Sequence, residues 1–214
     1  MQPAPLESKA KKEAREARNK TIFGLIIIFI MVFSTLGYVL WWREPEQSAD
    51  NPDIKTYNNH TFYRSYSEWI TPVIIDNNQV NISMNYLPEE LGNVTVKGTP
   101  LKISDFKNKA VYLIADDNNE QIAASGFGLI ESIAKRMQFA CLEEEANETF
   151  CTERDLPVKS CSDADAEHAV IIVKETNIDP RVIYETGCLQ VKGTGSENLT
   201  MASEKALYQI LGII

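Results

Sequence analysis

An uninterrupted apolar run near the N-terminus constrains this chain more than any other feature. From Thr21 to Trp42 there is no charged residue. A helix rises about 1.5 Å per residue, so the run would extend roughly 33 Å, enough to cross the hydrocarbon core of a bilayer. Tyr38, Trp41 and Trp42 lie at its far end, where aromatic rings favour the headgroup level. We therefore expect residues 21–42 to form a single transmembrane helix.

Two alternatives to a retained anchor are a cleaved signal peptide and a buried helix of a soluble core. A signal peptide has a shorter apolar core and ends in an A-x-A-like site. Thr35 and Gly37 match that site poorly, and no alanine follows before Ala49. A buried helix of this length normally shows a polar face, whereas the interior of this run offers only Ser34 and Thr35.

Flanking charge predicts the orientation of the helix. Positive residues stay on the cytoplasmic side, and Lys9, Lys11, Lys12, Arg15, Arg18 and Lys20 all precede the run. We expect a single-pass cell-membrane protein in contact with the lipid bilayer, its N-terminus cytoplasmic and its C-terminal domain outside. The predicted parts are a basic cytoplasmic tail at 1–20, the helix at 21–42, a linker at 43–54 and an extracytoplasmic domain at 55–214.

The charge of the chain argues against nucleic-acid binding. The formal net charge is -9, and the basic tail contributes +3, so the rest of the chain carries -12. A domain this acidic repels phosphate backbones.

The cysteines predict a disulfide framework. Cys141, Cys151, Cys161 and Cys188 all follow the apolar run, and an even number in an oxidising compartment is typical of two disulfides. Free thiols are the main alternative, because the spacing lacks the close pair of a zinc site. We expect Cys141–Cys151 and Cys161–Cys188, with the other two connectivities still open, and no bound metal or cofactor.

Five N-x-[ST] sequences also follow the run, more than chance predicts, and they favour a glycosylated surface. A sugar-free, asparagine-rich surface is the alternative. The candidate sites are Asn59, Asn81, Asn93, Asn147 and Asn198.

The outer region begins with strand patterns. The stretch "WITPVIIDNNQVNISMNY" holds two apolar runs around a turn at residues 76–78, with period-two alternation in the second run. Pro72 places the first run at an edge or a bulge, because proline cannot donate to a ladder. The continuous apolar run at 109–116 predicts a strand buried on both faces.

After this strand we expect a helix, a loop, two strands and a final helix. Ile122, Gly126, Leu129, Ile130, Ile133 and Met137 share one helical stripe, so Cys141 would end a long helix. An acidic cysteine loop covers 142–167. Strands at 169–175 and 181–193 would form a hairpin that turns at Asp179-Pro180 and places Cys188 opposite His168. The last helix covers 199–211, with Gly212 as its stop.

This order predicts an α+β or α/β domain. The segment "GTPLKISDFKNKAVYLIADD" is similar to the one that opens membrane-anchored thioredoxin-like proteins, and Pro157 falls near that family's proline. The resemblance implies a thioredoxin-like fold, here with an added β-hairpin. However, Asp117-Asn118-Asn119-Glu120 stands where the family has C-x-x-C, so the redox chemistry is not implied. The whole-chain layout also resembles single-pass archaeal envelope proteins.

Three groups of residues are candidate sites. Asp163, Asp165 and Glu167 could bind calcium, but the EF-hand positions for glycine and glutamate hold His168 and Lys174. Ser125 and His168 could belong to a hydrolase, but Ser125 lacks the G-x-S-x-G elbow. A possible aromatic binding face comprises Phe62, Tyr63, Tyr66 and Trp69.

Core packing, a solvated acidic loop and local pairing of His168 are the simpler interpretations of these groups. We therefore expect a non-enzymatic, membrane-anchored and disulfide-stabilised interaction or structural domain of the cell envelope, with an envelope protein as its partner. The alternative is a thioredoxin-like thiol or chaperone accessory for exported proteins.

Overall fold

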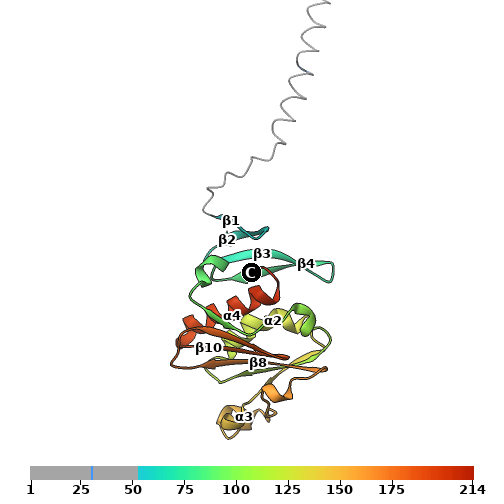
Figure 1. Cartoon of the computed structure of the whole chain (residues 1–214), viewed down its shortest axis with the longest axis vertical. Helices are drawn as coiled ribbons and strands as arrows, with labels where there is room; N and C mark the ends of the chain where they lie inside the picture. The colour runs from blue at the N-terminus through green and yellow to red at the C-terminus, as the bar shows by residue number, and fades with distance from the viewer. Residues whose placement is uncertain (1–29, 31–52) are drawn as a thin grey trace, which may run out of the picture. The chain divides into compact units, whose positions relative to one another are not determined.

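The computed structural model describes residue 30 and residues 53–214, and the latter belong to one compact unit. Within 53–214 the chain forms a mixed α+β domain with two sheets and three α-helices. The four-stranded sheet, a pair of helices and the six-stranded sheet are stacked as successive layers (Figure 1). A smaller helix, α3 (Thr149–Glu153), lies beyond the six-stranded sheet.

The first sheet is an antiparallel meander in the order β1-β2-β3-β4. Each connection between its strands has only two residues. Asn58, Asn59, Asp76 and Asn77 adopt positive φ, as the two central residues of type I′ hairpin turns must. The strands are β1 (Ile54–Tyr57), β2 (His60–Ser65), β3 (Glu68–Ile75) and β4 (Asn78–Met84).

The predicted hairpin around residues 76–78 is confirmed as β3 and β4. Pro72 lies opposite Asn81 of β4, and the pairing of β3 with β2 ends at Ile70. The proline therefore occupies a stretch of β3 that has a paired strand on one side only, which explains how the sheet tolerates its missing N–H.

The second sheet has the order β5-β9-β10-β8-β6-β7 and is mixed. Neighbours among β7, β6, β8 and β10 are parallel, and β9 is antiparallel to β10. All six residues of β6 are buried, which confirms the predicted two-sided burial. The strands are β5 (Thr95–Lys97), β6 (Ala110–Ala115), β7 (Arg136–Ala140), β8 (His168–Glu175), β9 (Arg181–Glu185) and β10 (Cys188–Gly193).

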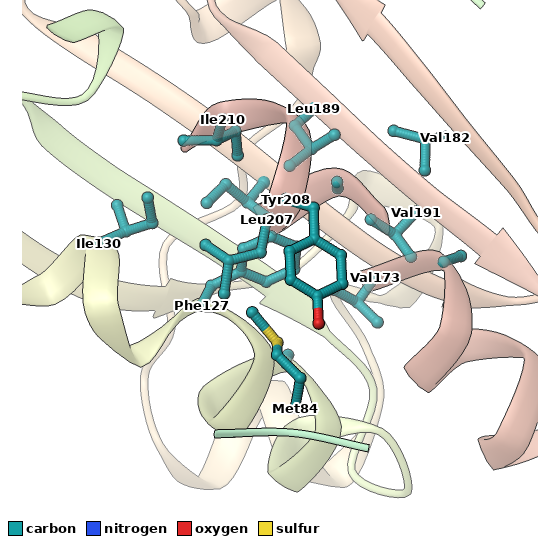
Figure 2. Packing of buried hydrophobic residues seen from close by; sticks show 14 of the residues in the cluster. Met84, Phe127, Ile130, Val173, Val182, Leu189, Val191, Leu207, Tyr208 and Ile210 are labelled. Atoms are coloured by element: carbon teal, nitrogen blue, oxygen red, sulfur yellow. The ribbon is translucent and has the colours of Figure 1, made fainter. Parts of the chain in front are cut away.

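Two helices fill the space between the sheets. Helix α2 (Glu120–Glu131) connects β6 to β7, and helix α4 (Gly195–Ile210) follows β10, as predicted for the chain end. The Gly212 that follows α4 has a positive φ of 71°. In Figure 2, Leu207 and Tyr208 of α4 lie among Met84 of the first sheet, Phe127 of α2 and strand residues of the second sheet.

The opposite face of the second sheet is covered by the cysteine segment. This segment contains η3 (Glu143–Glu145), α3 and η4 (Cys161–Asp163). Leu142, Cys161 and Ala164 pack there on a second apolar cluster of six strand residues, and β6, β7, β8 and β10 all contribute to it. The six are Tyr112, Ile114, Ala140, Val170, Ile172 and Cys188.

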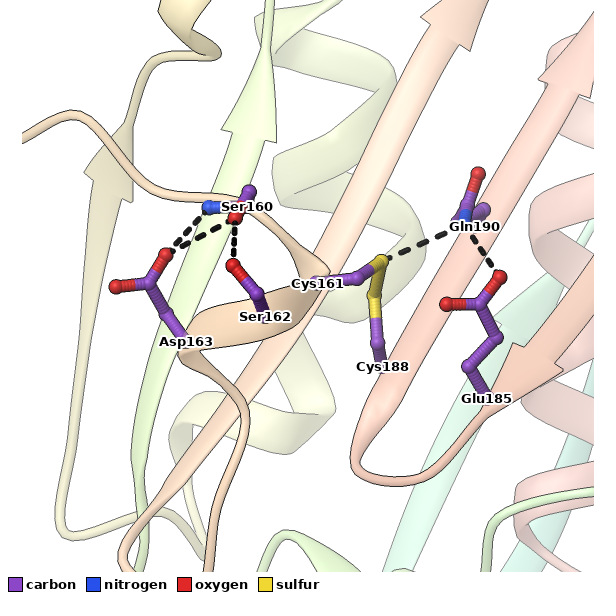
Figure 3. Close-up of a disulfide and its surroundings, with 7 residues drawn as sticks. All are labelled: Ser160, Cys161, Ser162, Asp163, Glu185, Cys188 and Gln190. Carbon is purple, nitrogen blue, oxygen red and sulfur yellow. Dashed lines mark hydrogen bonds between the residues drawn. A yellow bond between two sulfur atoms is a disulfide. The ribbon is translucent and has the colours of Figure 1, made fainter.

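Both predicted disulfides are present, in the expected pairing. Cys141 bonds Cys151, which closes a loop that contains η3 and ends within α3. Cys161 bonds Cys188, which ties η4 to the first residue of β10 (Figure 3). The second bond therefore fixes the cysteine segment to the sheet that it covers.

Two predicted elements are wrong. The long helix ends at Glu131, and Met137 lies in β7, because residues 136–140 extend the sheet beside β6. The expected hairpin of 169–175 with 181–193 also does not form. Instead, residues 181–193 make their own hairpin, β9–β10, and β10 inserts beside β8 in parallel. Cys188 consequently pairs with Val170 rather than with His168.

The predicted fold class needs correction. Residues 54–84 form a separate sheet with α2 and α4 enclosed between it and the second sheet, so they are more than a hairpin added to a thioredoxin-like domain. The expected transmembrane helix at 21–42 lies outside the described residues. In the part of the chain that is described, no helix is long and apolar enough to cross a membrane. The described residues therefore do not support the predicted fold class with a single transmembrane helix or the predicted single-pass cell-membrane location.

The two disulfides predict unequal effects on stability. Loops of 10 and 27 residues are closed, so replacing Cys161 and Cys188 by alanine should lower the free energy of unfolding by roughly 3.5 kcal/mol, and replacing Cys141 and Cys151 by slightly less. Urea denaturation of the wild type and the two double variants measures the difference. Peptide mapping without reduction checks the pairing, and a linked Cys141–Cys161 or Cys151–Cys188 peptide would contradict it.

Candidate functional site

The main candidate site is a groove of about 550 Å³ between the first sheet and the two enclosed helices. We call it the β4 groove, because β4 forms one wall along most of its length. Helices α2 and α4 form the other side. Its lining residues are Glu68, Asn81, Ile82, Ser83, Met84, Asn85, Ile122, Ala124, Ser125, Gly126, Gly128, Leu129, Thr200, Ser203, Glu204 and Leu207.

A buried carboxylate lies at one end of the β4 groove. Glu204 of α4 is 5% exposed, and its Oε1 accepts hydrogen bonds from the backbone N and the Nδ2 of Asn85, both at 2.7 Å. Its Oε2 accepts from the backbone N of Tyr86 at 2.9 Å. Burial raises the pKa of Glu204, and the negative charge of Glu68 adds to this, whereas the three hydrogen bonds oppose it. Glu204 therefore anchors the end of β4 to α4.

A buried hydroxyl without a partner also lines the groove. Ser203 is 1% exposed, and among the described residues its Oγ finds no hydrogen-bond partner. Gly126 of α2 allows the two helices to approach closely here, since a Cβ on it would lie 3.1 Å from the Cβ of Ser203. A buried unpaired hydroxyl is costly, so a bound group that formed a hydrogen bond with Ser203 would remove this cost.

Four of the six α2 residues that line the groove are small. Ala124, Ser125 and Gly128 are all exposed, and a Cβ placed on Gly128 would meet no atom within 4 Å. In the part of the chain that the structure describes, the lining includes two carboxylates and no basic residue. The groove is therefore open and acidic, and its α2 side combines small residues with the larger Ile122 and Leu129.

A second cavity of about 560 Å³ opens where β6, β7 and β8 begin, and it is basic. Lys107, Lys109, Lys135 and Arg136 line it together with Glu167 and His168. Lys107 is paired with Asp76 at 2.6 Å, and Lys109 donates to the Asp165 carbonyl at 3.0 Å. Two of the four basic side chains of this cavity therefore already bind acceptors within the domain.

The candidate hydrolase residues are not brought together. Ser125 lies on α2 in the β4 groove, and His168 begins β8 in the basic cavity. His168 Nδ1 lies 2.9 Å from Asp165 Oδ1, and its ring stacks on Tyr112 with centroids 5.8 Å apart. This geometry agrees with local pairing of His168.

The acidic candidates for calcium bind their own backbone instead. Asp163 accepts from the Ser160 N–H at 2.8 Å and pairs with Lys159. Asp165 accepts from the N–H groups of Glu167 and His168 at 2.7 and 2.8 Å, and these bonds lower its pKa. Within residues 53–214 no group of three acidic, histidine or cysteine side chains is placed to hold a metal ion.

The aromatic candidates divide between core and surface. Phe62 and Trp69 are buried, and Phe62 meets Tyr208 edge to face with centroids 5.9 Å apart. Tyr63 and Tyr66 are exposed. Alternation along β2 and the turn after it explain the division, so the four rings do not form one face.

Four of the five candidate glycosylation sites are exposed: Asn59, Asn81, Asn93 and Asn147. Asn198 is half-buried, and its Nδ2 donates to the Thr194 carbonyl at 2.9 Å. Asn81 lines the β4 groove, so a glycan there would occupy the space of any ligand. All five sites stay predictions.

Sequence reasoning missed Glu204, Ser203 and Glu68. The first two lie on α4, which was predicted as the last helix, but no role was predicted for its polar residues. A helix enclosed between two sheets has no solvent face over much of its length, and the sequence contains no local signal for that enclosure.

The raised pKa of Glu204 predicts a pH-dependent stability. Between its ordinary value of 4.5 and the raised folded value, the folded state binds the proton more tightly than the unfolded state. The stability of the wild type relative to the Glu204→Gln variant should therefore fall as pH rises above 4.5 and level off above the folded pKa. Urea denaturation of both proteins across this range measures it. A relative stability that rises with pH would mean that the hydrogen bonds from Asn85 and Tyr86 outweigh burial.

No protein-family model matches this chain, and neither the curated proteins nor the solved structures contain a significant match. The comparisons therefore lend no support to the thioredoxin-like resemblance, and function must be inferred from the geometry alone.

Proposed function

We propose that residues 53–214 form a non-enzymatic, disulfide-stabilised binding domain that holds a segment of a partner protein in the β4 groove. The observation that supports this most is the groove itself, which combines open space with a buried, unpartnered hydroxyl at Ser203. Cavities of this size with a few polar groups are typical ligand sites.

The groups that could carry out chemistry in the groove have structural roles. The Glu204 carboxylate already accepts three hydrogen bonds from the chain that follows β4. The Ser125 hydroxyl donates to the Ile122 carbonyl of its own helix at 3.2 Å. A groove with these contacts is suited to holding a partner, so we favour binding over catalysis.

A thiol-exchange function has less support. All four cysteines are in disulfides, and Cys141, Cys151 and Cys188 are buried. An attacking thiolate would have to be released from a buried bond first. The disulfides instead hold the cysteine segment on the sheet, on the side away from the β4 groove.

Photo-crosslinking from two positions on α2 tests the proposal. Ser125 lines the β4 groove, whereas Gln121 is exposed one turn earlier and does not line it. Benzoylphenylalanine is placed at one of these two positions in the full chain, which is produced in its source cells. We expect a discrete crosslinked adduct from position 125 and none from position 121. The adduct should disappear when Gly128→Trp fills the groove.

Equal crosslinking from both positions would contradict the proposal, and so would an adduct that persists in the Gly128→Trp protein. Gly128 is exposed in the middle of α2 with open space around it, so the tryptophan should be accommodated without a clash. Circular dichroism and the thermal midpoint of each protein check this.

A further inference from the structure

We infer that the β4 groove binds an extended, basic peptide segment as a fifth strand along the free edge of β4. This inference rests on the proposed function and specifies the occupant and its mode of binding. The reasons are the exposed edge of β4, the direction of its backbone groups, the space beside it and the charge of the groove.

Strand β4 is the least protected of the four outer strands in residues 53–214. Folded proteins usually block an exposed edge with a charged side chain, a proline, a bulge or a very short strand. The other outer strands are shorter and each carries a basic residue: Lys55 in β1, Lys97 in β5 and Arg136 in β7. Strand β4 has seven residues, an unbroken register with β3, and neither charge nor proline.

The turn geometry determines which backbone groups of β4 point outward. In a two-residue hairpin the closing pair is hydrogen-bonded, and such pairs then alternate along the ladder. The closing pair here is Ile75 with Asn78. The N–H and C=O groups of Gln79, Asn81 and Ser83 therefore point away from β3.

Two independent features agree with this alternation. Pro72, which has no N–H to donate, faces Asn81, one of the outward residues. Asn85 follows the same alternation, and its N–H binds Glu204 rather than β3. The chain beyond β4 thus already uses an outward group to bind α4, and the three outward residues before it remain open to an incoming strand.

The space beside this edge fits a strand. Both faces of β4 line the groove, Asn81 and Ser83 from the outer face and Ile82 and Met84 from the inner face, so the groove follows the edge itself. Ala124, Ser125 and Gly128 face it from α2 with little bulk. An added strand would lie about 4.8 Å from β4, with alternate side chains directed toward these small residues.

Charge favours a basic segment over a second copy of this chain. Among residues 53–214, Glu68 and Glu204 are the only charged residues that line the groove, and Glu68 is exposed. A lysine or arginine of the added strand can pair with Glu68. A second copy would present its own uncharged β4 edge to the same carboxylate.

Short random peptides displayed on their encoding RNA supply the probe. They are selected on the full chain, with counter-selection on the Ser125→Trp variant. We expect enriched peptides that contain lysine or arginine among apolar residues. N-methylation of a bound peptide at every second residue should weaken binding by at least about tenfold, because each removes one backbone hydrogen bond, whereas N-methylation between those positions should change it by less than about twofold.

Variants of β4 provide the matched control. Ser83→Pro removes an outward N–H and leaves the ladder with β3 intact, whereas Ser83→Ala removes only the hydroxyl that donates to Glu68. We expect Ser83→Pro to lose binding and Ser83→Ala to keep it, with similar thermal midpoints. Glu68→Lys should weaken the binding of basic peptides and leave the binding of neutral peptides unchanged.

Three outcomes would overturn the inference. Binding that depends on Ser125 but is insensitive to N-methylation and to Ser83→Pro would keep the proposed function and exclude strand addition. A dimer in sedimentation velocity that Ser83→Pro abolishes would identify a second copy as the occupant. Failure to enrich any peptide over the Ser125→Trp counter-selection would refute both the inference and the proposed function.

Discussion

The enclosure of α4 between two sheets is the constraint on which the rest of the domain depends. Its buried residues cover most of the helix surface, including the polar Ser203 and Glu204. A polar group at such a position must find partners within the fold. Glu204 finds them in the chain that leaves β4, and Tyr208 donates to the Tyr86 carbonyl at 2.7 Å. The first sheet is therefore attached to α4 by both apolar contact and directed hydrogen bonds.

This attachment also creates the groove. Because Glu204 and Tyr208 hold residues 85 and 86 against α4, the end of β4 is drawn to the helix layer while the strand's outer edge stays beside α2. Gly126 lets α2 and α4 approach, and the small residues next to it leave the space open. On the far side of the second sheet, the Cys161–Cys188 bond fixes the covering segment without reaching the groove. The Cys161–Cys188 disulfide and the β4 groove therefore lie on opposite sides of the six-stranded sheet.

The sequence pattern correctly predicted those elements that are determined by residues close together in the chain. The run at 109–116 is a strand buried on both faces, and the Asp76-Asn77 turn forms a hairpin, because burial period and turn chemistry can be read directly. Met137 was predicted to lie in the helix because its distance in sequence from Ile133 fits a helical stripe. It lies in the short strand β7 instead. Residues 181–193 were read as one strand because the turn at Gly187 was given too little weight, so the expected cysteine pairing was reached through the wrong sheet geometry. The groove could not be predicted, since it depends on β4 and α4, which are more than 100 residues apart.

An unprotected edge has a cost, and the surroundings of β4 show how this fold limits it. Free N–H and C=O groups on a regular strand invite pairing with any extended chain. Here the edge opens beside α2, so an incoming strand must fit against the helix as well as the ladder. Glu68 favours positive charge in that strand, because it would repel an acidic one. The chain itself has a net charge of -9, so a second copy is a poor partner for the β4 edge. In the proposed mode of binding, the features that leave the β4 edge open therefore also select the strand that can pair with it.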